Sequence, residues 1–185
     1  YIAMTSFIAF DGCRRLASGN RLDIARALKA AVGAAGPLLA FDLETGVGVD
    51  FDLSGSDADL AARYGESESE RGPGRPRLGV IGREVTLLPR HWDWLERQRG
   101  GASAALRRLV EAARAADQGA TEAAQAKAAA YRLLSAMAGN LPGFEAAARA
   151  LFADDVATLR RLTAGWPADI VAAALARLSA PKAVC

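Results

Sequence analysis

The chain has few of the residues on which most catalytic and metal sites depend. It contains one histidine, His91, and two cysteines, Cys13 and Cys185, among its 185 residues. Zinc clusters and most acid–base pairs need more of these side chains, and a disulfide scaffold needs more cysteines. A Gly-x-Ser-x-Gly turn and a phosphate-binding loop are also missing. We therefore expect a protein that is not an enzyme, holds no cofactor and keeps its thiols free.

The sequence also lacks a long uncharged apolar run. No stretch approaches the roughly 18 residues that a membrane span needs, although 51% of the residues are apolar. That apolar fraction is sufficient for a folded core. Residues 1–10 have neither the basic start nor the cleavage site of a signal peptide. We expect a globular protein with a cytoplasmic location and no membrane partner.

Charge of one sign is concentrated in the middle of the chain. The whole sequence carries 23 basic and 21 acidic side chains, a net charge of +2. Residues 71–114 hold ten arginines and four acidic residues, whereas residues 1–70 are net acidic. A basic segment of this kind indicates a polyanion partner. The alternative is a general bias, because arginine- and alanine-rich usage runs through the whole chain.

The first third of the chain predicts a small α+β unit. An apolar run at residues 5–10 is followed by an Asp-Gly turn, which is typical of a β-hairpin with residues 13–18 as the return strand. Apolar residues at helical spacing follow over residues 21–32. Apolar and acidic residues then alternate over residues 39–53 on either side of a Thr-Gly turn, which predicts a second hairpin. The order ββαββ places one helix on a four-stranded sheet.

Four carboxylates fall on the outward face of the second hairpin. Divalent cations bind clustered oxygen ligands, so one interpretation of this face is a metal site. Alternate residues on a strand spread over a face instead of converging on a point. We favour a solvated face and expect no metal. The four residues are Asp42, Glu44, Asp50 and Asp52.

Residues 54–79 predict a flexible linker that changes from acidic to basic, with a short helix near residues 58–64. Its basic part, residues 71–77, reads Arg-Gly-Pro-Gly-Arg-Pro-Arg. Gly-Arg-Pro flanked by arginine resembles an AT-hook, a basic arm that lies in the minor groove of DNA. The negative potential of that groove attracts guanidinium groups.

Residues 80–116 predict a strand followed by two helices. An apolar strand over residues 83–88 ends at Pro89, which begins the first helix. Two glycines separate it from an arginine-rich helix over residues 104–116, which Ser103 can cap. This order resembles the ribbon-helix-helix DNA-binding fold. The alternative is an internal edge strand of a plain α+β core.

The ribbon-helix-helix resemblance implies a homodimer on double-stranded DNA. In that fold, two chains pair their strands into a ribbon that enters the major groove, and the start of the second helix binds a phosphate. Arg83 and Thr86 would then reach base edges, and Ser103 would lie at the phosphate. The predicted DNA-binding residues are Arg71, Arg75, Arg77, Arg83, Thr86, Arg90 and Ser103.

The last third predicts a helical bundle over residues 121–179, with large apolar residues spaced as a core. An aromatic-lined ligand pocket is the alternative explanation, but helix packing accounts for the same residues. The expected fold class is α+β, mostly α. The expected domains are 1–53 (α+β), 54–79 (linker) and 80–185, the last divided into residues 80–116 and 121–179.

Five stretches spread over nearly the whole chain resemble one bacterial family, the domain of unknown function 2239. The family is uncharacterised, so the resemblance implies kinship but neither an activity nor a site residue. The stretches are residues 10–19, Gly74–Val80, Arg83–Trp92, Ser135–Phe144 and Trp166–Ile170.

Two functions therefore remain open. The first is a dimeric DNA-binding transcriptional regulator that uses the basic arm and the ribbon-helix-helix-like segment. The second is a non-enzymatic interaction module whose helical C-terminal half binds a protein partner, which the sequence does not identify.

Overall fold

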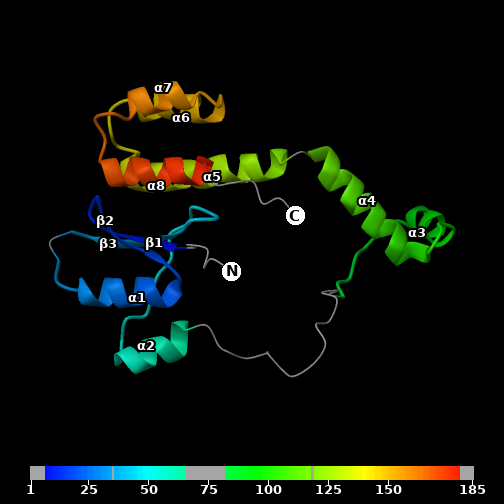
Figure 1. Ribbon diagram of the computed structural model, residues 1–185, viewed down its shortest axis with the longest axis horizontal. Helices are drawn as coiled ribbons and strands as arrows, with labels where there is room; N and C mark the ends of the chain where they lie inside the picture. The colour runs from blue at the N-terminus through cyan, green and yellow to red at the C-terminus, as the bar shows by residue number, and fades with distance from the viewer. Residues whose placement is uncertain (1–6, 35, 66–81, 118, 180–185) are drawn as a thin grey trace. The chain divides into compact units, whose positions relative to one another are not determined.

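The computed structural model describes residues 7–34, 36–65, 82–117 and 119–179. It is α+β and mostly helical, as predicted. Contacts divide the chain into two units (Figure 1). The first unit joins residues 1–66 with residues 121–185, and the second unit is residues 67–120.

A three-stranded antiparallel sheet forms the centre of the first unit. Its strands, in the order β2-β1-β3, are β1 (Phe7–Asp11), β2 (Arg14–Gly19) and β3 (Leu38–Asp42). In β1, Phe7 and Ala9 face one side of the sheet and Ile8 and Phe10 face the other, and none is more than 8% exposed. A strand covered on both faces carries a continuous apolar run, which explains why these residues do not alternate with polar ones.

Two helices, α1 (Arg21–Ala30) and α2 (Asp57–Tyr64), complete the N-terminal part of this unit. Each begins with a capping box, at Asn20 and at Ser56, in which the cap side chain and the third helical residue satisfy each other's backbone N–H groups. α1 covers the Phe7 face of the sheet through Ile24 and Leu28. α2 is fixed to α1 by the bidentate pair of Arg26 and Asp57, at 2.8 and 2.7 Å.

The C-terminal helices cover the opposite face of the sheet (Figure 1). Ile8, Phe10 and Phe41 pack there with Leu133 and Ile170 in one core. The edge strand β2 is also bonded to this layer, because the Arg15 N–H donates to the Asp169 carboxylate at 2.8 Å. The helices are α5 (Ala120–Ala138), α6 (Phe144–Phe152), α7 (Val156–Leu162) and α8 (Ala168–Ser179).

The predicted four-stranded sheet is wrong, because the chain leaves the sheet soon after β3. Phe41 and Gly48 form an isolated bridge, and no strand continues over residues 49–53. Phe51 packs edge-on against Phe7 and also against Tyr64 of α2. The contacts of Phe51 with the sheet and with α2 favour this path of the chain over a fourth strand paired with β3. The order of elements in this part of the chain is therefore ββα followed by a single further strand, β3.

The predicted domain boundaries also differ from the structure. The short helix predicted near residues 58–64 is confirmed as α2, but its Leu60 is fully buried, so this part of the expected linker is folded. Residues 121–179 join the N-terminal sheet and not residues 80–116. The physical reason is that the second face of the sheet is apolar and needs a cover, which α5–α8 provide.

The second unit contains α3 (Pro89–Glu96) and α4 (Gly101–Asp117), which pack against each other. Only two of its described side chains are buried, Leu95 and Ala105. None of the helices in the described ranges combines the length and the apolar character needed to cross a bilayer.

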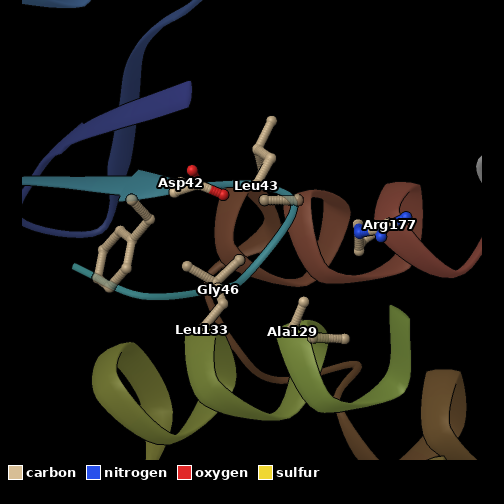
Figure 2. Close-up of a pocket in the computed structure, with 9 residues that line it drawn as sticks. Asp42, Leu43, Gly46, Ala129, Leu133 and Arg177 are labelled. Atoms are coloured by element: carbon tan, nitrogen blue, oxygen red, sulfur yellow. The ribbon is translucent and has the colours of Figure 1, made fainter. Parts of the chain in front are cut away.

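The turn after β3 docks closely on α5 (Figure 2). Asp42 accepts hydrogen bonds from the backbone N–H groups of Glu44 and Thr45, and Arg132 of α5 donates to the Thr45 carbonyl at 2.8 Å. Gly46 follows with φ +71° and is buried. A Cβ at Gly46 would lie 2.7 Å from the Ala129 carbonyl carbon and still closer to its oxygen. The turn can therefore approach the helix backbone only with glycine at this position.

A small cavity of about 10 Å³ lies beside this turn, with Arg177 of α8 on its wall (Figure 2). The cavity is too small for anything larger than one water molecule. The Arg177 Nε atom is buried and has no hydrogen-bond partner among the described residues. A buried N–H without an acceptor costs free energy, so this atom does not stabilise the fold.

Replacement of Gly46 by alanine tests the docking of this turn. We expect Gly46→Ala to lower the free energy of unfolding by about 3 kcal/mol or more, because the methyl group collides with the Ala129 backbone. The matched control is Gly33→Ala, since Gly33 also has positive φ but nothing within 4 Å of an added Cβ. That variant should lose only about 1 kcal/mol. Urea denaturation measures both, and equal losses would contradict the docking.

Replacement of Arg177 by methionine tests the unpaired Nε atom. Methionine keeps an unbranched chain and removes the buried donor, so we expect stability to stay unchanged or rise by up to ~1 kcal/mol. Arg160→Met, at an exposed position of α7, is the control and should have little effect. Thermal unfolding of both variants measures the difference. A marked loss for Arg177→Met alone would show that the guanidinium group is stabilising.

Candidate nucleic-acid interface

Residues 82–88 form neither a helix nor a strand in the structure, and Leu88 at their end has an extended backbone. The predicted strand over residues 83–88 is therefore wrong for the single chain. The reason is that a strand needs a hydrogen-bonding partner, and none of the described segments pairs with these residues. They do not belong to the sheet of the first unit either, so the alternative of an internal edge strand is excluded within the described chain.

Pro89 begins α3, as predicted. Its fixed φ suits the first helical position, where no N–H donor is needed. The Leu88 carbonyl accepts from His91 N–H at 2.8 Å and closes the first turn. Leu95 is buried, whereas His91 and Trp94 are exposed. The segment of residues 82–88 therefore ends where α3 begins, at Pro89.

α4 begins at Gly101, earlier than expected, so Ser103 is not its cap. Gly100 and Gly101 have φ of +84° and +73°, and Gly101 N–H donates to the Gln98 carbonyl at 2.9 Å. This tight turn starts the helix two residues before Ser103, which lies exposed in the first turn. N–H groups of a first helical turn have no acceptor within their helix. The backbone around Ser103 thus keeps the donors that a phosphate could use.

The structure exposes every predicted DNA-binding residue that it describes. Arg83 and Thr86 lie in the segment of residues 82–88, Arg90 in the first turn of α3 and Ser103 in the first turn of α4. All four are exposed. The three remaining predicted residues lie outside the described residues: Arg71, Arg75 and Arg77.

An exposed set of large apolar side chains is the main feature that the sequence-based interpretation missed. Leu109 and Val110 of α4 are adjacent apolar residues on this helix, and both side chains are about half exposed. The spacing of apolar residues along a helix predicts that one face of the helix is apolar. It does not predict whether other parts of the same chain cover that face. The apolar set of the second unit is Val85 (49% exposed), Leu88 (49%), Trp94 (51%), Leu109 (48%) and Val110 (53%).

The pKa shifts of the protein lie at helix caps and ion pairs in the first unit. The Arg26 side chain lowers the pKa of Asp57 through their hydrogen bonds. Hydrogen bonds from Ser56 lower the pKa of Asp59, and those from Thr158 lower the pKa of Asp155. Stabilised carboxylates of this kind are structural, because each is bonded to the backbone or to a cation of the fold.

The four carboxylates of the predicted second hairpin do not gather at one point. Asp42 is bonded to the turn that follows it, whereas Asp52 accepts from Ser54 and pairs with Arg63 at 3.3 Å. Among the residues that the structure describes, no group of three or more histidine, cysteine, aspartate or glutamate side chains could hold a metal ion.

Comparison with curated proteins and with solved structures finds no match. A family model matches residues 6–178, which is nearly the whole chain. The match covers both units, including the unit that carries the exposed arginines. The chain belongs to the family described as uncharacterised proteins conserved in bacteria, domain of unknown function 2239 (DUF2239).

Proposed function

We propose that this protein is a dimeric transcriptional regulator of the bacterial cytoplasm that binds double-stranded DNA through its second unit and the basic arm before it. The observation that carries the proposal is the state of residues 82–88. They form neither a helix nor a strand, the backbone of Leu88 is extended, and all are exposed apart from the half-buried Leu87, with no ladder partner among the described residues. An exposed strand-like segment of this kind is available to pair with another chain.

The exposed apolar side chains support a homodimer. The two helices of the second unit bury only one leucine and one alanine, which contribute at most a few kcal/mol. Ordering the backbone of two helices costs more than that. A second copy that covers Leu88, Leu109 and Val110 would supply the missing apolar contacts and bring two extended segments together.

The charge of the same unit supports DNA as its partner. Arg83 and Arg90 are exposed on either side of the start of α3. A ribbon of two extended segments fits the major groove, and arginine hydrogen-bonds well to guanine edges and phosphates. The first turn of α4, at Ser103, offers backbone donors for a phosphate. These features sit in or beside residues 71–114, which hold half of the arginines of the chain.

The second candidate function is a protein-interaction module formed by the C-terminal helices. One observation favours it: Phe152 at the end of α6 and Val156 at the start of α7 are 54% and 40% exposed. Two neighbouring apolar side chains make a smaller surface than the apolar set of the second unit. DNA binding therefore remains the proposal with more support.

A salt titration of DNA binding tests the electrostatic part of the proposal. Each phosphate contact contributes about −0.9 to the slope of log affinity against log salt concentration. We expect the variant Arg71→Gln, Arg75→Gln, Arg77→Gln to bind more weakly and to have a slope that is smaller by roughly 3. Fluorescence anisotropy with a labelled duplex measures both quantities.

The matched control removes the same charge from the first unit. Arg149, Arg160 and Arg161 are exposed there, and their replacement by glutamine should leave the slope almost unchanged. Absence of binding at low salt would overturn the DNA proposal. An equal effect of the two triple variants would show that only the total charge matters.

The oligomeric state tests the dimeric part separately. We expect the wild-type protein to be a dimer, and we expect Leu109→Glu to be monomeric because the carboxylate would be buried in the interface. Val32→Glu, at an exposed apolar position of the first unit, is the control and should remain dimeric. Sedimentation equilibrium measures the mass. A monomeric wild-type protein at the concentrations used for DNA binding would exclude the ribbon.

A further inference from the structure

A second cavity, of about 110 Å³, lies among the C-terminal helices of the first unit. It is distinct from the small cavity beside the turn after β3, and it involves no residue of the second unit. Its apolar wall comes from four helices: Ala123 and Ala126 of α5, Leu151 of α6, Val156 and Leu159 of α7 and Leu178 of α8. A ligand in this cavity would therefore touch none of the residues proposed to bind DNA.

The apolar wall determines what can occupy the cavity. A buried water molecule needs two to four polar partners, and the wall offers polar groups only at Lys127 and Asp154. A cavity of roughly 150 Å³ lined by apolar side chains in another protein binds a ring of about six carbon atoms. By comparison, the present cavity has room for an apolar tail of about four carbon atoms.

The polar end of the cavity carries an asymmetric ion pair. The Lys127 Nζ atom donates to the Asp154 carboxylate at 2.6 Å. The lysine side chain is only 21% exposed, whereas the aspartate side chain is 73% exposed. Solvent therefore screens the negative partner more than the positive one. An ammonium group has three donors, so Lys127 can bind an anionic group in addition to Asp154.

The loop that carries Asp154 is held in an uncommon conformation. Asp154 has φ +60°, in the left-handed region, and lies between α6 and α7. The backbone N–H of Asp155 donates to Ala150 and the Asp155 side chain caps α7, so the loop is fixed on both sides. Asp154 and Lys127 are thereby held together on the wall of the cavity. Strained residues of this kind often mark binding sites.

We infer that this cavity binds a short-chain carboxylate: an alkyl tail of about four carbon atoms among the apolar side chains, with the carboxylate on Lys127. A cationic head group would be repelled by the half-buried Lys127 ammonium group, and the Asp154 carboxylate that could attract it is more exposed and already paired with Lys127. A long-chain lipid would have a tail that exceeds the volume. A small anionic metabolite with an apolar tail is the class of ligand that fits both the volume and the charge.

Titration of the full-length protein with sodium pentanoate tests this inference. We expect saturable shifts of the methyl resonances of Leu151, Leu159 and Leu178 in NMR spectra. Pentylamine, with the same tail and a positive head group, should cause much weaker shifts. Absence of saturable shifts with pentanoate would overturn the inference, and so would equal binding of the amine.

Two variants separate the roles of the tail and the head group. Ala123→Leu fills the cavity and should abolish pentanoate binding, whereas Ala124→Leu, at the exposed neighbouring position, should not change it. Lys127→Gln should weaken pentanoate binding about tenfold and leave the binding of pentan-1-ol unchanged. Wild-type affinity in Ala123→Leu, or equal effects of Lys127→Gln on acid and alcohol, would show that the ligand does not bind in this way.

Discussion

The burial of β1 on both faces is the constraint on which the first unit depends. Ile8 and Phe10 lie in one core with the C-terminal helices, and Phe7 and Ala9 lie in a second core with α1. Because one helix cannot cover both faces, residues 121–179 must return to the N-terminal sheet. Residues 67–120 then form an insertion between the two halves of the unit. None of the described residues 82–117 belongs to either of these two cores. Packing in the first unit therefore does not constrain which residues occupy these positions of the insertion.

The two units use their charged residues differently. In the first unit, ion pairs connect separate elements, as between Arg26 of α1 and Asp57 of α2. Its lowered aspartate pKa values have the same origin, since caps and ion pairs stabilise the carboxylate form. In the second unit, Arg114 pairs with Glu111 within the same helix, α4. Positive charge there is presented to the surroundings and contributes little to the fold.

The sequence predicted the elements whose signals are local. The helix that begins at Pro89 and the short helix near residues 58–64 both follow from residues close in the chain. Features that depend on distant contacts were not predictable. The alternation over residues 39–53 is the same whether the chain pairs as a strand or turns toward α2, and the Phe51 contacts decide the outcome. For the candidate interface, the exposed arginines were predictable, but the uncovered face of α4 was not.

Dimer formation and DNA binding by the second unit would be thermodynamically linked. A dimer would bring together two copies of residues 71–114, each with a net charge of +6. Repulsion between these charges opposes the dimer, whereas burial of apolar surface favours it. Phosphates neutralise that charge, and linkage requires that DNA strengthen the dimer by the same factor by which the dimer strengthens DNA binding. Salt acts on the two equilibria with opposite signs: it screens the repulsion within the dimer and weakens the attraction to DNA. If the second unit binds DNA as a dimer, as proposed, the exposed apolar face would favour the dimer and the DNA phosphates would neutralise the arginine charge that opposes it.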